Sequence, residues 1–210
     1  MPKFNESEMA EMKSRFLAVC RTVNRPGMED LLDWLENSDF FTAPASTKFH
    51  GNYECGLLEH SLHVLDKTWD LVSKYPNLGI SKDSVIIAAL FHDITKANYY
   101  VKDYKNVKVY SENGLKRDER GRFDWVSQSC YKIDDKLPLG HGEKSVIILQ
   151  SFIKLQRDEI YAIRWHMGGF DSAVKGGDFA MSKAYEVCPL AVMLHMADVE
   201  SSYLLETIEK

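Results

Sequence analysis

Six histidines and aspartates carry the chemistry that this sequence suggests. A lone histidine is more often a packed or solvated residue than a ligand, but four of the seven histidines fall at or near separate predicted helices. Imidazole and carboxylate groups together suit first-row divalent metals, and no thiol lies near them as a structural zinc site would require. The candidate metal ligands are His60, His92, Asp93, His141, His166 and Asp198.

Both candidate aspartates follow apolar stretches that look internal. Asp93 comes directly after residues 85–92, a run without a charged side chain, and Asp198 ends a similar run that begins at Ala191. A carboxylate in such a place is expensive to bury unless a cation or hydrogen bonds compensate it. Two such acids favour a shared cation. The sequence therefore predicts a divalent metal cofactor, one or two ions, with Mn, Fe, Ni, Co, Zn and Mg all open.

The elements that must position these residues are mainly α-helices. Apolar residues recur at spacings of three and four, with short polar or Gly/Pro breaks between the segments. Capping residues at 81–83 precede an almost wholly apolar helix that ends at His92-Asp93 and should be central and buried. We expect helices over about 6–23, 26–35, 56–74, 85–91, 142–155, 158–167 and 184–209.

The pattern changes between residues 99 and 136, where apolar residues lie among many charges. Asn113-Gly114 and Arg120-Gly121 are turn signals, so we expect a β-hairpin or a long-loop excursion that is a candidate lid or substrate-reading flap. Its first half interleaves basic residues with tyrosines, a combination that could hold a phosphate and stack a base. A solvated hairpin face explains the same pattern almost equally well.

Composition bounds the remaining possibilities. The chain has 210 residues and a formal net charge of −5, which fits one domain and argues against coating nucleic acid through bulk charge. The four cysteines form no C-x-x-C pair and are expected to be reduced thiols. No run is long and apolar enough for a membrane span or a signal peptide. We therefore expect a cytoplasmic protein with a small-molecule partner and no membrane contact.

Three segments resemble a known family. GLLEHSLHV (56–64), ALFHDITKA (89–97) and HMADVESSY (195–203) are similar, in order and spacing, to the H…HD…D signature of HD-domain metal-dependent phosphohydrolases. The resemblance spans residues 50–205 and implies an all-α HD-domain helical bundle. It also implies a single domain over 1–210, with a helical cover at 1–50, a core at 51–98 and 137–210, and an insertion at 99–136.

The resemblance assigns roles to the candidate ligands. The first histidine, the HD pair and the late aspartate hold one metal in that family, which corresponds to His60, His92, Asp93 and Asp198. LGHGEKS (139–145) and IRWHMGG (163–169) match the two histidines that members with a second metal add. His141 and His166 would then hold the second ion, with Asp93 bridging the pair.

Further residues are candidates for catalysis or substrate binding. The family often has glycine before the lysine of its H-D-x-G-K motif, whereas this chain has Thr95 there and retains Lys96. Asp93 and Lys96 are the catalytic candidates, and Lys96 is either a phosphate-facing cation or a solvated lysine. The candidate substrate-binding residues are Lys96, Lys144 and Tyr99. Glu59 and Glu143 could transfer protons or support the ligands, but exposed glutamates on helix surfaces are the favoured interpretation. His63 and His195 are not included among the ligands.

The implied activity is hydrolysis of a phosphoester by metal-activated water, and the favoured substrate is a nucleotide. One alternative is a 3′–5′ exoribonuclease-like phosphodiesterase on short single-stranded nucleic acid, because GLLEHSLHV is especially similar to the HD domain of bacterial 3′–5′ exoribonucleases. The chain has no room for the separate nucleic-acid-binding barrel of that family. Another alternative is a non-catalytic metal- or ligand-binding HD module. Aromatic residues of the cover, Phe16, Trp34, Phe40 and Phe41, indicate core packing or a homodimer contact, with core favoured.

Overall fold

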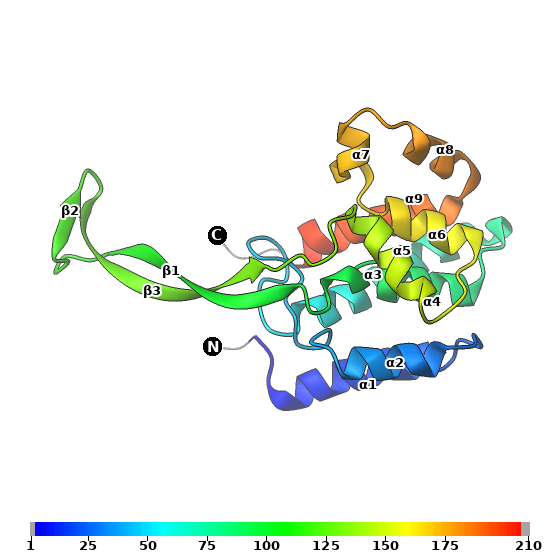
Figure 1. Ribbon diagram of the computed structural model, residues 1–210, viewed down its shortest axis with the longest axis horizontal. Coiled ribbons are helices and arrows are strands. Elements are labelled where there is room, and N and C mark those ends of the chain that lie inside the picture. The colour runs from blue at the N-terminus through cyan, green and yellow to red at the C-terminus, as the bar shows by residue number, and fades with distance from the viewer. Residues whose placement is uncertain (1–2, 207–210) are drawn as a thin grey trace.

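A computed structural model describes residues 3–206 and shows a helical body from which a long β-ribbon projects (Figure 1). The mainly helical prediction is confirmed for the body. Between residues 3 and 206, no helix combines the length and apolar character needed to cross a membrane. The α-helices are α1 (Glu6–Cys20), α2 (Met28–Glu36), α3 (Gly56–Ser73), α4 (Lys82–Phe91), α5 (His141–Gln150), α6 (Arg157–Trp165), α7 (Ser172–Lys175), α8 (Ala180–Val187) and α9 (Pro189–Glu200).

Helix α4 is the centre of the body. Every residue from Ser84 to Phe91 is buried, because neighbouring helices cover the apolar segment on several sides. Helix α3 packs against α4 and α9, and α6 packs against α4, α5 and α9. A helix that is apolar all round requires this kind of enclosure. The ends of α4 and α6 are consequently held at fixed positions inside the molecule.

Helices α1 and α2 and the loop after them cover one side of this core. The ring of Phe16 lies 5.4 Å from each of the rings of Phe40 and Phe41 and 5.7 Å from that of Phe91, measured between centroids. Phe16, Phe40 and Phe41 are buried, which confirms the core interpretation of these aromatic residues. Trp34 is half-buried and packs on Phe152.

The excursion over 99–136 is a hairpin with an added strand, so the hairpin alternative is the correct one. Strand β1 (Tyr100–Tyr110) pairs antiparallel with β3 (Gly121–Ile133), with Tyr100 opposite Ile133 and Tyr110 opposite Phe123. Strand β2 (Lys116–Asp118) lies on the other edge of β3 at the tip. Of these three strands, β2 is the one that goes beyond the expected helical fold with a hairpin excursion.

The helix expected over 184–209 is wrong in extent. Pro189 begins α9, and the preceding Cys188 has φ −133° and ψ 90°, so α8 and α9 are separate helices. Proline has no amide hydrogen, and its ring disfavours a helical conformation in the residue before it. A π-helical turn, Ser201–Leu205, follows α9, and residues 207–209 lie outside the described part. Helix α2 also begins later than expected, because Gly27 has φ +86°.

A buried ion pair joins the cover to the core. Glu159 of α6 is fully buried, and its carboxylate accepts hydrogen bonds from the Arg25 guanidinium at 2.9 and 3.0 Å and from the Ser84 hydroxyl at 2.8 Å. The same carboxylate accepts a hydrogen bond from the backbone N–H of Gln156 and so caps α6. One side chain thereby connects three separate segments.

Glu159→Ala is expected to lower the free energy of unfolding by about 3 kcal/mol, because it leaves the Arg25 charge half-buried without its partner. Denaturant unfolding followed by circular dichroism measures the change. Glu36→Ala is the control, since Glu36 pairs with Lys13 on the surface with both side chains about 40% exposed, and its loss should cost less than about 1 kcal/mol. Equal effects of the two substitutions would contradict the expectation.

Candidate metal centre

The structure brings all six predicted ligands to one place inside the helical body. His60 lies on α3 and Asp198 on α9, whereas His141 is the first residue of α5. His92 and His166 are the C-terminal caps of α4 and α6. The candidate donor atoms form overlapping groups of three, each with its atoms within 4.8 Å of one another, and together these groups include all six side chains.

Asp93 is at the centre of this cluster, and its two oxygens face different histidines. Oδ1 lies 2.6 Å from His141 Nε2 and 3.5 Å from His166 Nε2. Oδ2 lies 3.5 Å from His92 Nε2 and 3.6 Å from His60 Nε2. One carboxylate therefore adjoins two pairs of imidazoles, one pair at each oxygen.

Asp198 closes the cluster on the side of α3 and α9. Its Oδ1 lies 3.3 Å from His60 Nε2, and His60 Nε2 lies 3.2 Å from His92 Nε2. The two helices pack directly against each other. Two imidazole nitrogens and carboxylate oxygens from both acids thus surround one small volume.

Local backbone contacts orient two of the imidazoles. Nδ1 of His92 donates to the Ala89 carbonyl at 2.8 Å, and Nδ1 of His166 donates to the Ile163 carbonyl at 2.6 Å. Each ring satisfies a free carbonyl at its helix end and points Nε2, with its lone pair, into the cluster. His166 Nε2 is buried without a hydrogen-bond partner in the described part of the chain. An unpartnered, inward-pointing imidazole nitrogen beside a carboxylate fits a divalent metal ion.

The electrostatics agree with a requirement for a cation. Burial lowers the pKa of His92 to about 3, so this imidazole is neutral and able to bind a metal. Burial also acts to lower the pKa of His60, but the carboxylates of Glu206 and Asp198 outweigh it and raise that pKa to about 10. Burial raises the pKa of Asp93, but Lys96 and the neighbouring imidazoles outweigh it and hold that pKa well below its usual value. A metal ion would take the place of the proton on His60.

The sequence reasoning missed Glu206, which lies behind His60. The buried Glu206 carboxylate accepts a hydrogen bond from Nδ1 of His60 at 3.0 Å and another from Nδ1 of His63 at 2.9 Å. His63 therefore contacts Glu206, which holds the candidate ligand His60, and is not itself part of the cluster. His50 also lies beside this ligand, with its ring 4.9 Å from that of His60.

The backbone turn after Asp93 accommodates threonine. Ile94–Lys96 is a single 3-10 turn, and the φ angle of Thr95 is not positive. Glycine is therefore not required at that position. The turn brings the Lys96 ammonium to 2.5 Å from Asp93 Oδ2, at the edge of the cluster.

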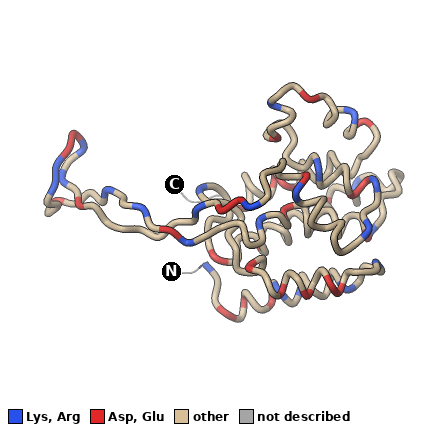
Figure 2. Tube along the Cα trace, viewed as in Figure 1, with Lys and Arg blue, Asp and Glu red and all other residues tan. Residues whose placement is uncertain are grey.

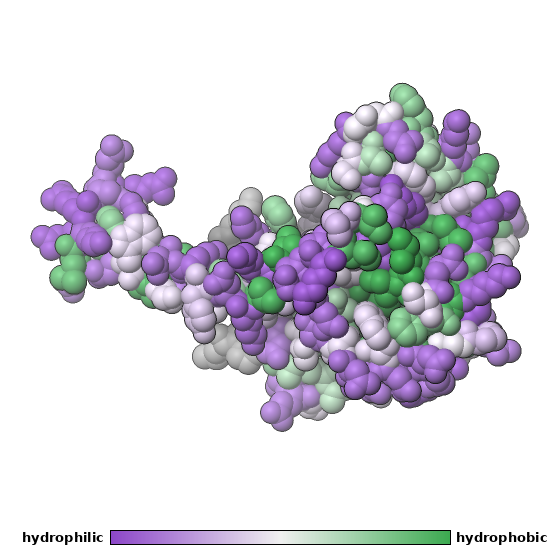
Figure 3. Space-filling model, in the orientation of Figure 1, coloured by the Kyte–Doolittle hydropathy of each residue, from purple (hydrophilic) through white to green (hydrophobic). Residues whose placement is uncertain are grey.

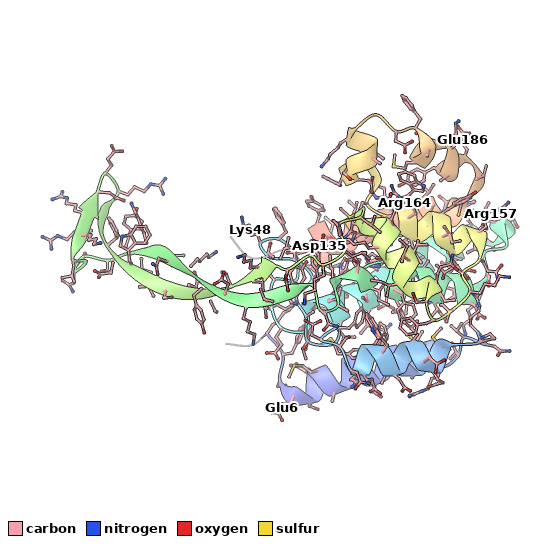
Figure 4. All side chains as sticks on the ribbon, viewed as in Figure 1. Glu6, Lys48, Asp135, Arg157, Arg164 and Glu186 are labelled. Carbon is pink, nitrogen blue, oxygen red and sulfur yellow. The ribbon has the colours of Figure 1, made fainter. Side chains whose placement is uncertain are left out.

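The other sequence candidates lie around the cluster or are engaged elsewhere. The Lys144 ammonium lies 5.0 Å from the centre of the Tyr99 ring and 2.7 Å from a carboxylate oxygen of Asp135, which Figure 4 labels where the ribbon meets the body. Glu143 pairs with Arg164. Glu59 binds Lys3 and Tyr53, and His195 donates to the His166 carbonyl.

Comparison with known proteins gives one partial similarity. No protein-family model matches the chain, and no solved structure matches it. A stretch of 63 residues is 36% identical to a dihydroneopterin 2′,3′-cyclic phosphate phosphodiesterase of Methanocaldococcus jannaschii. The stretch is 29% of this chain and 25% of that protein, so the similarity covers about a quarter of the length of that relative. Part of the chain is therefore similar to a phosphodiesterase, and the helical body contains several His/Asp groups placed to bind a metal ion.

Metal content tests the arrangement around Asp93. Wild-type protein purified with added manganese is expected to hold two equivalents, Asp93→Ala none, and His141→Ala one, because Asp93 adjoins both pairs of imidazoles and His141 only one. Elemental analysis by plasma mass spectrometry gives the counts. Asp66→Ala, which removes a half-exposed carboxylate elsewhere on α3, should keep the wild-type count. One equivalent in wild type that persists in His141→Ala would reject the second ion.

Glu206→Gln is expected to weaken metal binding about 10- to 100-fold, since the carboxylate orients His60 and makes it more basic. Competition with a fluorescent chelator measures the affinity. Glu200→Gln removes a partly exposed carboxylate that pairs with Lys67 and should leave the affinity within threefold of wild type. An unchanged affinity in Glu206→Gln would show that this hydrogen bond does not matter for the metal.

Proposed function

We propose that the chain is an HD-type metal-dependent phosphohydrolase that cleaves a phosphoester bond of a nucleotide. The observation that carries the proposal is the position of the Asp93 carboxylate, with His141 and His166 at one oxygen and His60 and His92 at the other. The partial similarity to a phosphodiesterase supports the same class of reaction.

The ligands fall into two sets under this proposal. His60, His92, Asp93 and Asp198 would hold one ion, and His141 and His166 would hold a second ion that shares Asp93. Bound divalent ions polarise a phosphoryl oxygen and lower the pKa of a water ligand, which supplies a nucleophile at neutral pH. The backbone contacts of His92 and His166 keep their Nε2 atoms directed at the centre, so little reorganisation accompanies binding.

Lys96 is the proposed phosphate-facing cation. Its ammonium lies at the edge of the cluster beside Asp93, and its side chain is mostly buried. A fixed positive charge in a water-poor site stabilises the negative charge that develops on the phosphoryl oxygens in the transition state. Lys144 and Tyr99 lie together, and we propose that the Tyr99 ring meets the base of the nucleotide while a phosphate takes the place of Asp135 at the Lys144 ammonium.

The relative supports a proposal for the kind of bond. The M. jannaschii protein is a phosphodiesterase for a 2′,3′-cyclic phosphate. We extend this to a phosphodiester as the bond that the present chain cleaves.

Hydrolysis of bis(p-nitrophenyl) phosphate with added manganese tests the proposal. Wild type should turn over, chelator should abolish the activity, and Asp93→Ala should be inactive because both sets of ligands lose their shared acid. Lys96→Gln should lower kcat about 100-fold, the usual effect of removing one charge-stabilising donor. Asp66→Ala should retain wild-type activity. Equal inactivity of wild type and Asp93→Ala on this diester and across a panel of nucleotides would favour the non-catalytic binding module.

A further inference from the structure

The β-ribbon formed by β1 and β3 extends well beyond the helical body (Figures 1 and 2). Two-stranded ribbons are marginally stable alone in water and gain stability when something covers them. Several large side chains of the ribbon are exposed, among them Tyr104 at 72% and Trp125 at 49%. Exposed aromatic rings on a projecting element indicate a surface that meets a partner.

The strand register sorts the side chains of the ribbon onto two different faces. Residues directly opposite each other share a face, as do residues two apart along a strand. Lys102 lies opposite Tyr131, Tyr104 opposite Ser129, and Lys108 opposite Trp125. One face, here called the aromatic face, therefore carries Tyr100, Tyr104, Tyr110, Phe123, Trp125 and Tyr131.

The charges on the aromatic face are of one sign along β1 and β3. Lys102 and Lys108 belong to this face, and none of the residues that these strands place on it is an acid. The acids of the two strands, Asp103 and Asp124, are on the opposite face, together with the basic residues Lys105, Arg122 and Lys132 and several valines. Asp118 of β2 joins the aromatic face at the tip, where it binds Lys108 and Tyr110.

The ribbon differs in charge from the whole chain. Residues 100–133 contain eight Lys or Arg and five Asp or Glu, whereas the full chain has 26 and 31. Figure 3 shows the visible surface of the ribbon as mostly hydrophilic. Basic groups among flat aromatic rings match a polyanion that carries stackable bases.

The aromatic face begins close along the chain to the candidate metal centre. Strand β1 begins four residues after Lys96, and the Tyr99 and Tyr100 ring centroids are 5.0 Å apart. Lys144 lies over Tyr99. The ring of Tyr100 lies 6.4 Å from that of Tyr131, so aromatic rings begin where the ribbon leaves the body, four residues after Lys96.

We propose that the aromatic face of the ribbon binds a single-stranded oligonucleotide and leads one end of it to the metal centre. Bases stack on Tyr104 and Trp125, Lys102 meets one phosphate, and another phosphate takes the place of Asp118 at the Lys108 ammonium. The inference rests on the proposed function for its chemistry. Hydrolysis of the terminal phosphodiester forms one P–O bond to the oxygen of a water molecule and breaks the P–O bond to the leaving oxygen. The proton that the water gives up balances the one that the leaving oxygen takes to become a hydroxyl, and a mononucleotide is released.

Two triple variants of the full chain test the binding face. Tyr104→Ala/Lys108→Ala/Trp125→Ala alters the aromatic face. Lys105→Ala/Val109→Ala/Val126→Ala removes the same number of side chains and one lysine from the opposite face of the same strands. Fluorescence anisotropy with a labelled 12-nucleotide oligoadenylate, in the presence of chelator to prevent cleavage, gives the affinity. Circular dichroism checks that both variants are folded.

The aromatic-face variant should bind the oligonucleotide at least about 30-fold more weakly than wild type, because it loses two stacking platforms. The opposite-face variant should bind within threefold of wild type. Equal losses in the two variants, or no binding by wild type, would overturn the inference.

Light scattering tests whether a second copy covers the ribbon instead. A wild-type dimer that becomes a monomer in the aromatic-face variant alone would overturn the oligonucleotide inference. Wild-type hydrolysis of bis(p-nitrophenyl) phosphate separates the two proposals. If wild type hydrolyses the diester but the aromatic-face variant binds the oligonucleotide as wild type does, the proposed function holds and the further inference fails. If the aromatic face binds the oligonucleotide but wild type does not hydrolyse the diester, the binding inference holds and the proposed function fails.

Discussion

The burial of the Asp93 carboxylate is the constraint on which the rest of the structure depends. A charged group that is 3% exposed, just after the apolar segment 85–91 of α4, is stable only among groups that compensate its charge. The Lys96 ammonium and the His141 imidazole lie within hydrogen-bonding distance of its two oxygens and supply part of that compensation, whereas the Nε2 lone pairs of His92 and His166 suit a cation. The packing of α3 and α6 against α4, and of α5 against α6 and the turn at 94–96, brings these groups within reach.

The helix ends contribute as much to the cluster as the helix faces. His92 follows the last residue of the buried helix α4, and His166 follows that of the partly exposed helix α6. At both ends backbone carbonyls lack intrahelical partners. Each ring uses Nδ1 to satisfy such a carbonyl and directs Nε2 inward. The same device at two helix ends produces two preoriented donors without any additional polar group. The packing that holds these two helix ends inside the molecule therefore also orients the Nε2 atoms that could bind a metal.

The candidate metal ligands and the exposed aromatic residues of the ribbon lie in different parts of the molecule. The body encloses the reactive groups, whereas the ribbon presents aromatic rings and lysines outside it. β1 follows the turn that carries Lys96 after only three intervening residues, so the chain itself connects the two parts. A substrate that is long enough to contact both would be selected by its length and its bases as well as by its phosphate.

Local patterns in the sequence determined the helical segments, the hairpin with its turns, and the types of ligand, because periodicity, glycine and proline act within a few residues. The apolar run before His92-Asp93 is what indicated a buried carboxylate at Asp93. Only the tertiary structure decided that Asp93 presents each oxygen to a different pair of imidazoles and that Glu206 supports His60. In a straight α-helix Glu206 would lie about 80° around the axis from Asp198, but the π-helical turn at 201–205 brings both acids to His60. That placement depends on how α9 packs against α3, which no local pattern encodes.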